Sequence, residues 1–296
     1  MKEFEYIPAN SLSEAVEILA REGERARLLA GGTDLITRIR MGREEAPDYL
    51  VSLRQLQELN YLTFGQDGSL HLGALATLHS VEADPRVTKN FAALAEAAAS
   101  VGSLQVRNIG TVVGNVCSAS SAADAAVALL ALGATARVIG PQGEREVGLA
   151  GLFAGPRQTS LGRGEMVKEV FVPAPRSRTG QVFLRVSPRR AMDCSVAAVA
   201  ATVTLGEDGR IEEARIGLGA VAPTPKRASA AESILKGNAP TGEILKAAGD
   251  AAARGCEPIS DIRGSMEYRR EMVRVMTVRA VAEASRRASH QRGVRR

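Results

Sequence analysis

The residues of this chain with the clearest capacity for ligand chemistry lie together in residues 105–124, QVRNIGTVVGNVCSASSAAD. Thr111, Gly114 and Asn115 combine small size with hydrogen-bonding groups, and glycine lets the backbone approach a ligand closely. The segment ends at Asp124, whose carboxylate can accept the paired hydroxyls of a ribose. We therefore interpret this segment as a binding loop that lies along a phosphorylated nucleotide.

A second segment of the same design lies upstream, at residues 28–35 (LLAGGTDL). An apolar strand, a glycine pair and short polar residues open a helix there, and such a junction directs backbone N–H groups at an anion. Two simpler interpretations compete: a Gly- and Ser-rich segment is most often a turn, and the Ala-rich residues 122–132 suit a packed helix. The repetition of the design favours the nucleotide.

The composition limits the other classes of function. With 296 residues and 45% hydrophobic content, the chain is long enough for two domains that each have a core. Only 3% of the residues are aromatic and there is no Trp, which argues against a surface that stacks on sugars or bases. Much of the net charge of +5 comes from the C-terminal arginines, which we interpret as a solvated tail and not as a nucleic-acid site.

The sequence also indicates the compartment. The N-terminus MKEFEYIPAN lacks the apolar stretch of a signal peptide, and no window has the roughly 18 consecutive apolar residues of a membrane span. Cys117, Cys194 and Cys256 are far apart and form no C-x-x-C pair, which argues against disulfides, zinc or an iron–sulfur cluster in this chain. We expect a cytoplasmic protein.

The pattern of the chain predicts alternating helices and strands. Ser11 and Glu14 form a capping box for a first helix that Gly23 ends. Strands at 27–30 and 49–53 flank a helix at 34–41, and strands at 62–75 turn at Asp67-Gly68. Further on, the pattern predicts helices at 91–100 and 122–132 and strands at 134–139, 145–147 and 165–172.

Residues 173–180 (PAPRSRTG) have the composition of a linker, so we predict domains at 1–175 and 176–296. Strands at 181–186, 195–205 and 211–218 follow, with the turn at 206–209 indicating an antiparallel meander. The chain ends with predicted helices at 226–235, 241–253 and 265–287.

Side chains for acid–base catalysis are scarce. His71, His79 and His290 have no carboxylate or cysteine at metal-ligand spacing, and we interpret His71, which alternates with apolar residues, as structural. Neither a G-x-S-x-G elbow nor a phosphate-binding G-x-x-x-x-G-K-[ST] loop occurs. We predict no catalytic or metal-binding residue, so a bound cofactor would have to carry any reaction.

The two glycine segments, in this order and with the opening F-x-Y-x-x-P-x-S-L-x-E-A, resemble the FAD-binding medium subunit of the molybdenum hydroxylases. Xanthine dehydrogenase and aerobic carbon monoxide dehydrogenase belong to that family, and the resemblance covers nearly the whole chain. It implies an α+β fold: a vanillyl-oxidase-type (PCMH-type) FAD-binding domain with subdomains at about 1–57 and 58–175, then a C-terminal α+β domain with an antiparallel three-stranded sheet. One departure is Val113, where many members have a glycine.

The resemblance also implies roles for particular residues. The first segment would wrap the FAD pyrophosphate with the N–H groups of Leu29, Ala30, Gly31, Gly32, Thr33, Asp34, Leu35 and Ile36. The second would supply donors from Thr111, Val112, Val113, Gly114 and Asn115, with a hydroxyl from Ser118 and the ribose hydroxyls on Asp124. Val101 and Gly102 would lie against the flavin or its ribityl chain, Val167 would pack near the ring, and Arg185 would stabilise negative charge on the reduced flavin.

The implied function is electron transfer within a heterotrimer. A large molybdenum–pterin subunit would hydroxylate the substrate, and a small subunit with iron–sulfur clusters would pass electrons to the FAD of this chain and on to an external acceptor, in a dimer of heterotrimers. Two alternatives remain open. One is a stand-alone flavin reductase of the UDP-N-acetylenolpyruvoylglucosamine type, and the other is a flavin-free scaffold subunit that uses the glycine segments only as turns.

Overall fold

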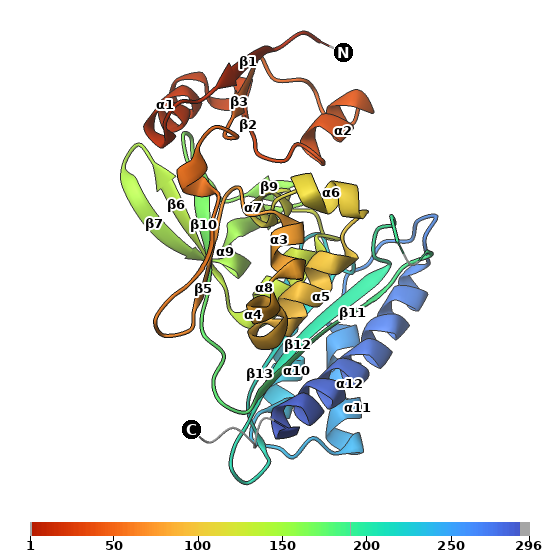
Figure 1. Ribbon diagram of the computed structural model, residues 1–296. Coiled ribbons are helices and arrows are strands. Elements are labelled where there is room, and N and C mark those ends of the chain that lie inside the picture. Colours follow the sequence, from red (N-terminus) through yellow and green to blue (C-terminus); the bar gives the residue numbers. More distant parts are fainter. Residues whose placement is uncertain (1, 190, 291–296) are drawn as a thin grey trace.

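The computed structural model describes residues 2–189 and 191–290 (Figure 1). Helices make up 40% and strands 26%, which confirms the predicted α+β class. Three main sheets follow one another from top to bottom in Figure 1. Within the described residues, no helix has the length and apolar composition needed to cross a bilayer.

The first sheet is small and parallel, in the order β1 (Glu5–Pro8), β3 (Tyr49–Ser52), β2 (Ala26–Leu29). Helix α1 (Leu12–Glu22) and the turn η1 (Gly23–Arg25) lead from β1 to β2, and α2 (Leu35–Arg40) leads from β2 to β3. The Ser11 hydroxyl accepts from the Glu14 N–H at 3.1 Å, and Gly23 ends α1 with φ +57°. The predicted β-α-β unit is confirmed. The pattern did not predict β1.

The second sheet has five antiparallel strands: β4 (Leu62–Phe64), β5 (Leu70–Gly73), β10 (Met166–Val172), β6 (Thr135–Gly140) and β7 (Gly143–Gly148). The short turn η2 (Gln57–Leu59) precedes it. Leu70, Leu72 and Val170 from the sheet share one core with helical residues such as Leu94 and Leu129. The predicted turn at Gly68 is confirmed, with φ +84°.

Helices between β5 and β6 gather beside this sheet (Figure 1). They are α3 (Leu78–Ala83), α4 (Pro85–Asn90), α5 (Ala92–Ser100), α6 (Leu104–Ile109), α7 (Val112–Cys117) and α8 (Asp124–Leu132). The predicted loop at residues 111–115 was therefore wrong in its structure, because Thr111 caps α7 and the residues after it are helical. After β7 come α9 (Leu149–Leu152) and the hairpin of β8 (Phe153–Gly155) and β9 (Gln158–Thr159).

The C-terminal sheet is antiparallel, in the order β11 (Thr179–Val186), β12 (Ala197–Leu205), β13 (Ile211–Gly219), β14 (Lys226–Arg227). The three predicted strands are confirmed. The structure adds β14, where the sequence predicted the start of a helix. The helices are α10 (Ser229–Leu235), α11 (Gly242–Arg254) and α12 (Met266–His290). The domain boundaries at 57/58 and 175/176 stay a prediction.

The C-terminal sheet packs on both faces. Helix α12 covers β11 and β12, while α5 and α8 from the preceding part of the chain cover the other face. Glycines permit this contact: a Cβ on Gly217 would lie 2.2 Å from the Val127 carbonyl oxygen, and one on Gly180 would lie 1.9 Å from that of Ala284. All nine residues of α8 are buried, which explains its Ala-rich composition and its lack of a polar face.

Candidate cofactor-binding site

The two glycine segments touch each other. A Cβ on Gly31 would lie 2.3 Å from the Ile109 carbonyl oxygen and 2.9 Å from the Gly110 Cα. A Cβ on Gly110 would in turn lie 3.1 Å from the Thr33 hydroxyl oxygen. Such an approach of two backbones requires glycine. The fold therefore places residues 28–35 and 105–124, which the sequence assigns to one ligand, against each other.

The first segment is held from outside by Arg54, which the sequence did not single out. Its Nε and one terminal nitrogen donate to the carbonyl oxygens of Ala30 and Gly31, both at 3.1 Å. These contacts fix the orientation of two peptide groups in the turn between β2 and α2. Gly32 completes the turn with φ +76°, a conformation that a side chain would strain.

The second segment is organised by the start of α7. The Thr111 hydroxyl accepts from the Gly114 N–H at 2.9 Å, and the Val112 N–H donates to the Ala76 carbonyl at 3.0 Å. These two predicted donors are therefore bonded within the protein. Val113 is buried and its backbone is helical, which a β-branched residue tolerates in place of glycine. Asn115 links the helices, since its Oδ1 accepts from the Ala126 N–H of α8 at 3.4 Å.

Unusual backbone conformations gather around the second segment. Among the described residues, the non-glycine residues with positive φ include Ala119, Arg157, Met192 and Ala220. The Arg157 N–H donates to the Ala119 carbonyl (3.1 Å), and the Ala220 N–H donates to the Ser121 carbonyl (2.6 Å). Met192 N–H donates to the carbonyl of Gly102 (3.3 Å). Backbones in such conformations concentrate at functional sites, where the surrounding structure holds them.

Asp124 and Arg185, predicted for separate contacts, form one buried cluster. The Asp124 carboxylate accepts from the hydroxyls of Ser195 (2.7 Å) and Ser100 (2.9 Å) and from the Arg185 guanidinium (3.1 Å). Burial raises the pKa of Asp124, and these three donors act in the opposite direction. Ribose hydroxyls would have to share a carboxylate that already has three partners, so the ribose role stays a prediction.

The remaining predicted residues lie nearby or in the core. Gly102 follows α5 with φ +53°, and the Val101 carbonyl accepts from Arg107 at 3.2 Å. The Ser118 hydroxyl donates to the Asn115 carbonyl at the end of α7. Val167 lies on β10 inside the main core and is only 3% exposed. Its contact with a flavin ring stays a prediction.

A polar cluster on the middle sheet is structural. Glu169 on β10 accepts from the Tyr61 hydroxyl at 2.6 Å, lies 3.0 Å from His71 Nδ1 and pairs with Arg137 at 3.1 Å. Burial, followed by the hydrogen bond to Glu169, raises the pKa of Tyr61 and keeps it neutral. These contacts satisfy His71. Within residues 2–189 and 191–290, no group of His, Cys, Asp and Glu has the arrangement of a metal site.

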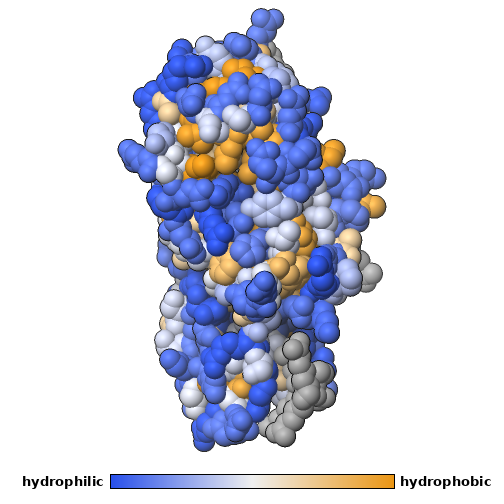
Figure 2. Space-filling model, turned by 60° about the vertical axis from the view of Figure 1, so that its left-hand side comes forward, coloured by the Kyte–Doolittle hydropathy of each residue, from blue (hydrophilic) through white to orange (hydrophobic). Residues whose placement is uncertain are grey.

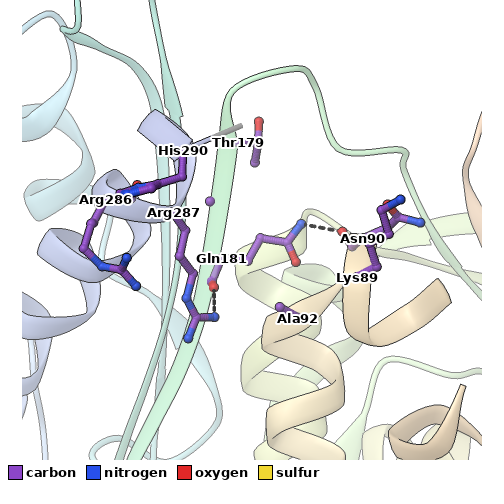
Figure 3. Close-up of a pocket in the computed structure, with 9 residues that line it drawn as sticks. Lys89, Asn90, Ala92, Thr179, Gln181, Arg286, Arg287 and His290 are labelled. Carbon is purple, nitrogen blue, oxygen red and sulfur yellow. Dashed lines mark hydrogen bonds between the residues drawn. The ribbon is translucent and has the colours of Figure 1, made fainter. Parts of the chain in front are cut away.

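Two of the cavities in the described part of the chain lie elsewhere. One of about 600 Å³ lies between α1 and the residues before β10, where Arg163 donates to the carbonyls of Ala20 and Arg21. The other, of about 360 Å³, lies where α4 and β11 meet the end of α12 (Figure 3). There the Gln181 amide donates to the Asn90 carbonyl at 3.0 Å, and the Arg287 guanidinium donates to the Gln181 carbonyl at 2.7 Å. Figure 2 shows that apolar residues on the face turned forward gather in its upper half and middle.

Comparison with known proteins identifies the family of this architecture. Residues 2–175 match the model of the FAD binding domain in molybdopterin dehydrogenase, and residues 182–284 match the CO dehydrogenase flavoprotein C-terminal domain. The chain belongs to this FAD-binding family. It is an FAD-dependent oxidoreductase subunit of the molybdenum hydroxylase type, and FAD is its cofactor.

Relatives of this FAD-binding subunit match almost end to end. The putative xanthine dehydrogenase FAD-binding subunit XdhB of Escherichia coli is 33% identical over 94% of this chain and 95% of that protein. The carbon monoxide dehydrogenase medium chain of Hydrogenophaga pseudoflava is 34% identical over 95% of this chain and 96% of the relative.

Solved structures agree with the sequence relatives. Carbon monoxide dehydrogenase from Hydrogenophaga pseudoflava superimposes with a TM-score of 0.92 at 34% identity, over 97% of this chain and 98% of the other. Quinoline 2-oxidoreductase from Pseudomonas putida 86 gives a TM-score of 0.88 at 31% identity, covering 97% and 99%. Membership in this family decides against the UDP-N-acetylenolpyruvoylglucosamine reductase type and the flavin-free scaffold.

The residues of the site fit a dinucleotide such as FAD. Gly31 and Gly110 leave no space for a side chain where the two segments meet, so the surface beside them is built of backbone. The Thr33 hydroxyl oxygen lies beside Gly110, and Thr111 follows as the N-cap of α7. A long ligand with phosphates in its middle suits a surface of this kind.

Proposed function

We propose that this chain is the FAD-carrying electron-transfer subunit of a molybdenum hydroxylase complex. Its FAD would accept electrons from iron–sulfur clusters of a small partner subunit and deliver them to an external acceptor. The observation that carries the proposal is the contact of Gly31 with Ile109 and Gly110, which brings two distant segments against each other. Bound FAD supplies the redox chemistry, and the protein supplies binding and orientation.

The partners follow from the same proposal. A large molybdenum–pterin subunit would carry out the hydroxylation, and the whole would be a cytoplasmic dimer of heterotrimers. Relatives named as medium chains of carbon monoxide dehydrogenase support a division of labour between subunits. The lack of a metal-binding group within the described residues of this chain is compatible with metal centres in other subunits.

In the proposed site, residues 29–36 hold the pyrophosphate and residues 111–115 with Ser118 lie along the dinucleotide. Val101, Gly102, Val167 and Arg185 are assigned to the flavin end. Two contacts support this placement: Gly31 meets Gly110, and a Cβ on Gly102 would lie 3.0 Å from a methyl carbon of Val106 in the second segment. The FAD-binding domain would comprise residues 1–175.

The experiment is electron transfer in the assembled complex with and without FAD. The complex is purified with its partner subunits, FAD is removed and then restored, and the organic substrate is added. We expect the iron–sulfur clusters to be reduced in both preparations, whereas the external acceptor is reduced only when FAD is present. Equal rates of acceptor reduction with and without FAD would show that this chain does not carry the electrons.

A further inference from the structure

Arg157 connects the two glycine segments of the proposed site. It lies in the turn between β8 and β9 with φ +62°, a backbone conformation that residues other than glycine rarely adopt. Its N–H donates to the carbonyl of Ala119 at 3.1 Å, and Ala119 itself has φ +43°. The backbone of Arg157 is therefore fixed on residues that follow α7 in the second segment.

The side chain of Arg157 reaches the first segment. One terminal nitrogen lies 2.9 Å from Oδ2 and 3.1 Å from Oδ1 of Asp34, which directly follows Gly31, Gly32 and Thr33. The side chains of Arg157 and Asp34 remain 37% and 47% exposed, so this ion pair is open to solvent and contributes little to stability. Arg157 could therefore exchange Asp34 for another anionic partner with little loss of folding stability.

Asp34 also creates an electrostatic problem that Arg157 can solve. Its carboxylate belongs to the residues proposed to wrap a pyrophosphate, and two anions at close range repel each other. Arg38 lies 3.9 Å from Asp34 but 3.2 Å from Glu44, so it is shared with another carboxylate. Arginine binds phosphate oxygens with several N–H donors in one plane, which backbone amides alone do not provide.

We propose that Arg157 is a pyrophosphate-binding residue, whose guanidinium leaves or shares Asp34 when a dinucleotide binds. The inference rests on the proposed function. The same chemistry has two sources: the pyrophosphate of FAD itself, or that of a soluble dinucleotide that accepts electrons. Nucleotide recognition then depends on a third chain segment, the β8–β9 turn, in addition to the two glycine segments.

The test is ligand binding by the full chain, with flavin fluorescence quenching as the readout. Arg157→Asn removes the charge, and asparagine tolerates positive φ. FAD affinity should fall about ten- to a hundredfold, the range for a charge-assisted hydrogen bond, while the affinity for riboflavin, which has no phosphate, stays unchanged. Arg157→Lys should lose less FAD affinity than Arg157→Asn, because lysine keeps the positive charge.

The matched control is Arg178→Asn. Arg178 is also an arginine with positive φ (+58°), but it lies in the connection between β10 and β11. We expect its FAD affinity to equal that of the unmodified chain. A second arm measures ADP-ribose binding to the FAD-loaded chain: a loss in Arg157→Asn with unchanged FAD affinity assigns the residue to the acceptor's pyrophosphate.

The proposal is overturned if Arg157→Asn changes neither FAD nor ADP-ribose binding. A parallel loss of riboflavin and FAD affinity would also overturn it, because that result indicates a purely structural clamp. Failure of the unmodified chain to bind FAD would instead refute the proposed function. The two failures are thus distinguishable.

Discussion

The guanidinium of Arg185 and the carboxylate of Asp124 form an ion pair of 3.1 Å that joins β11 to the start of α8. Only 10% and 5% of the two side chains are exposed. Removal of Arg185 from a pair this deep leaves the Asp124 carboxylate without its cation, which typically costs about 3–5 kcal/mol. The pair therefore holds Arg185 in one place, and Asp124 offsets part of the charge that Arg185 presents to its surroundings.

Arg185→Gln should lower the reduction potential of the bound FAD, because the Asp124 carboxylate then lacks its cation and destabilises the reduced flavin anion. We also expect the free energy of unfolding to fall by about 3 kcal/mol. A spectroscopic redox titration against a reference dye measures the first quantity, and urea denaturation measures the second.

The control for this variant is Arg287→Gln, because Arg287 also contacts β11, through the Gln181 carbonyl. Arg287 pairs with Glu96 at 2.7 Å, but both side chains are about one-third exposed, so the loss of stability should stay below about 1 kcal/mol. Its flavin potential should match that of the unmodified chain. An equal shift of potential in both variants would mean that loss of an arginine beside β11, and not of Arg185 in particular, changes the flavin potential.

Asp124→Asn separates the two roles of this carboxylate. If the main role is to hold Arg185, the flavin potential rises and FAD affinity changes little, because the ribose contact is minor. If Asp124 binds the ribose hydroxyls, FAD affinity falls roughly tenfold or more, the effect of about 1.4 kcal/mol in one interaction. Fluorescence titration with FAD together with a redox titration gives both quantities on one protein sample.

Gly31→Ala should abolish FAD binding. The added Cβ would lie 2.3 Å from the Ile109 carbonyl oxygen, so the two glycine segments would have to separate. Gly148→Ala is the matched control, because nothing lies within 4 Å of its Cβ and its φ of −59° suits any residue. The flavin absorbance of the two purified variants provides the measurement. Full FAD content in Gly31→Ala would contradict the joint surface.

Stability should decrease at acid pH through Glu283 on α12. Hydrogen bonds from Arg286 and then Arg287 lower the pKa of Glu283 from 4.5 to about 2. A carboxylate with a lowered folded-state pKa stabilises the fold above its unfolded-state pKa, and this contribution is lost as the pH falls from 4.5 towards 2. Urea midpoints at pH 5 and pH 3 should therefore differ less in Glu283→Gln than in the unmodified chain. Identical differences would exclude this carboxylate as a cause.

Much of the fold could be predicted because its signals are local. The Ser11 cap, the glycine stop at Gly23 and the turn at Gly68 each depend on a few neighbouring residues, and the structure shows all three. Helix α7 has no such signal, since VVGNVC contains valines and a glycine, which are weak helix formers. Packing of its buried valines and the Thr111 cap make it helical.

The site was predictable only in part, for the same reason. Glycine segments are visible in the sequence, but their contact depends on the fold. Arg157 and Asp34 are separated by 123 positions and Asp124 and Arg185 by 61, so no spacing rule could pair them. Arg54 likewise acts on carbonyl oxygens, which carry no residue-specific signal.

Helix α8 packs into two hydrophobic cores, one at the middle sheet and one on the C-terminal side. Its leucines pack into the core of the middle sheet, whereas Val127, Ala128 and Ala131 pack with Phe183 and Ala198 on the C-terminal side. Displacement of α8 would expose apolar side chains in both cores. We therefore expect heat to unfold the subunit in a single cooperative step. A protease cut between residues 173 and 178 should then leave two fragments that stay associated.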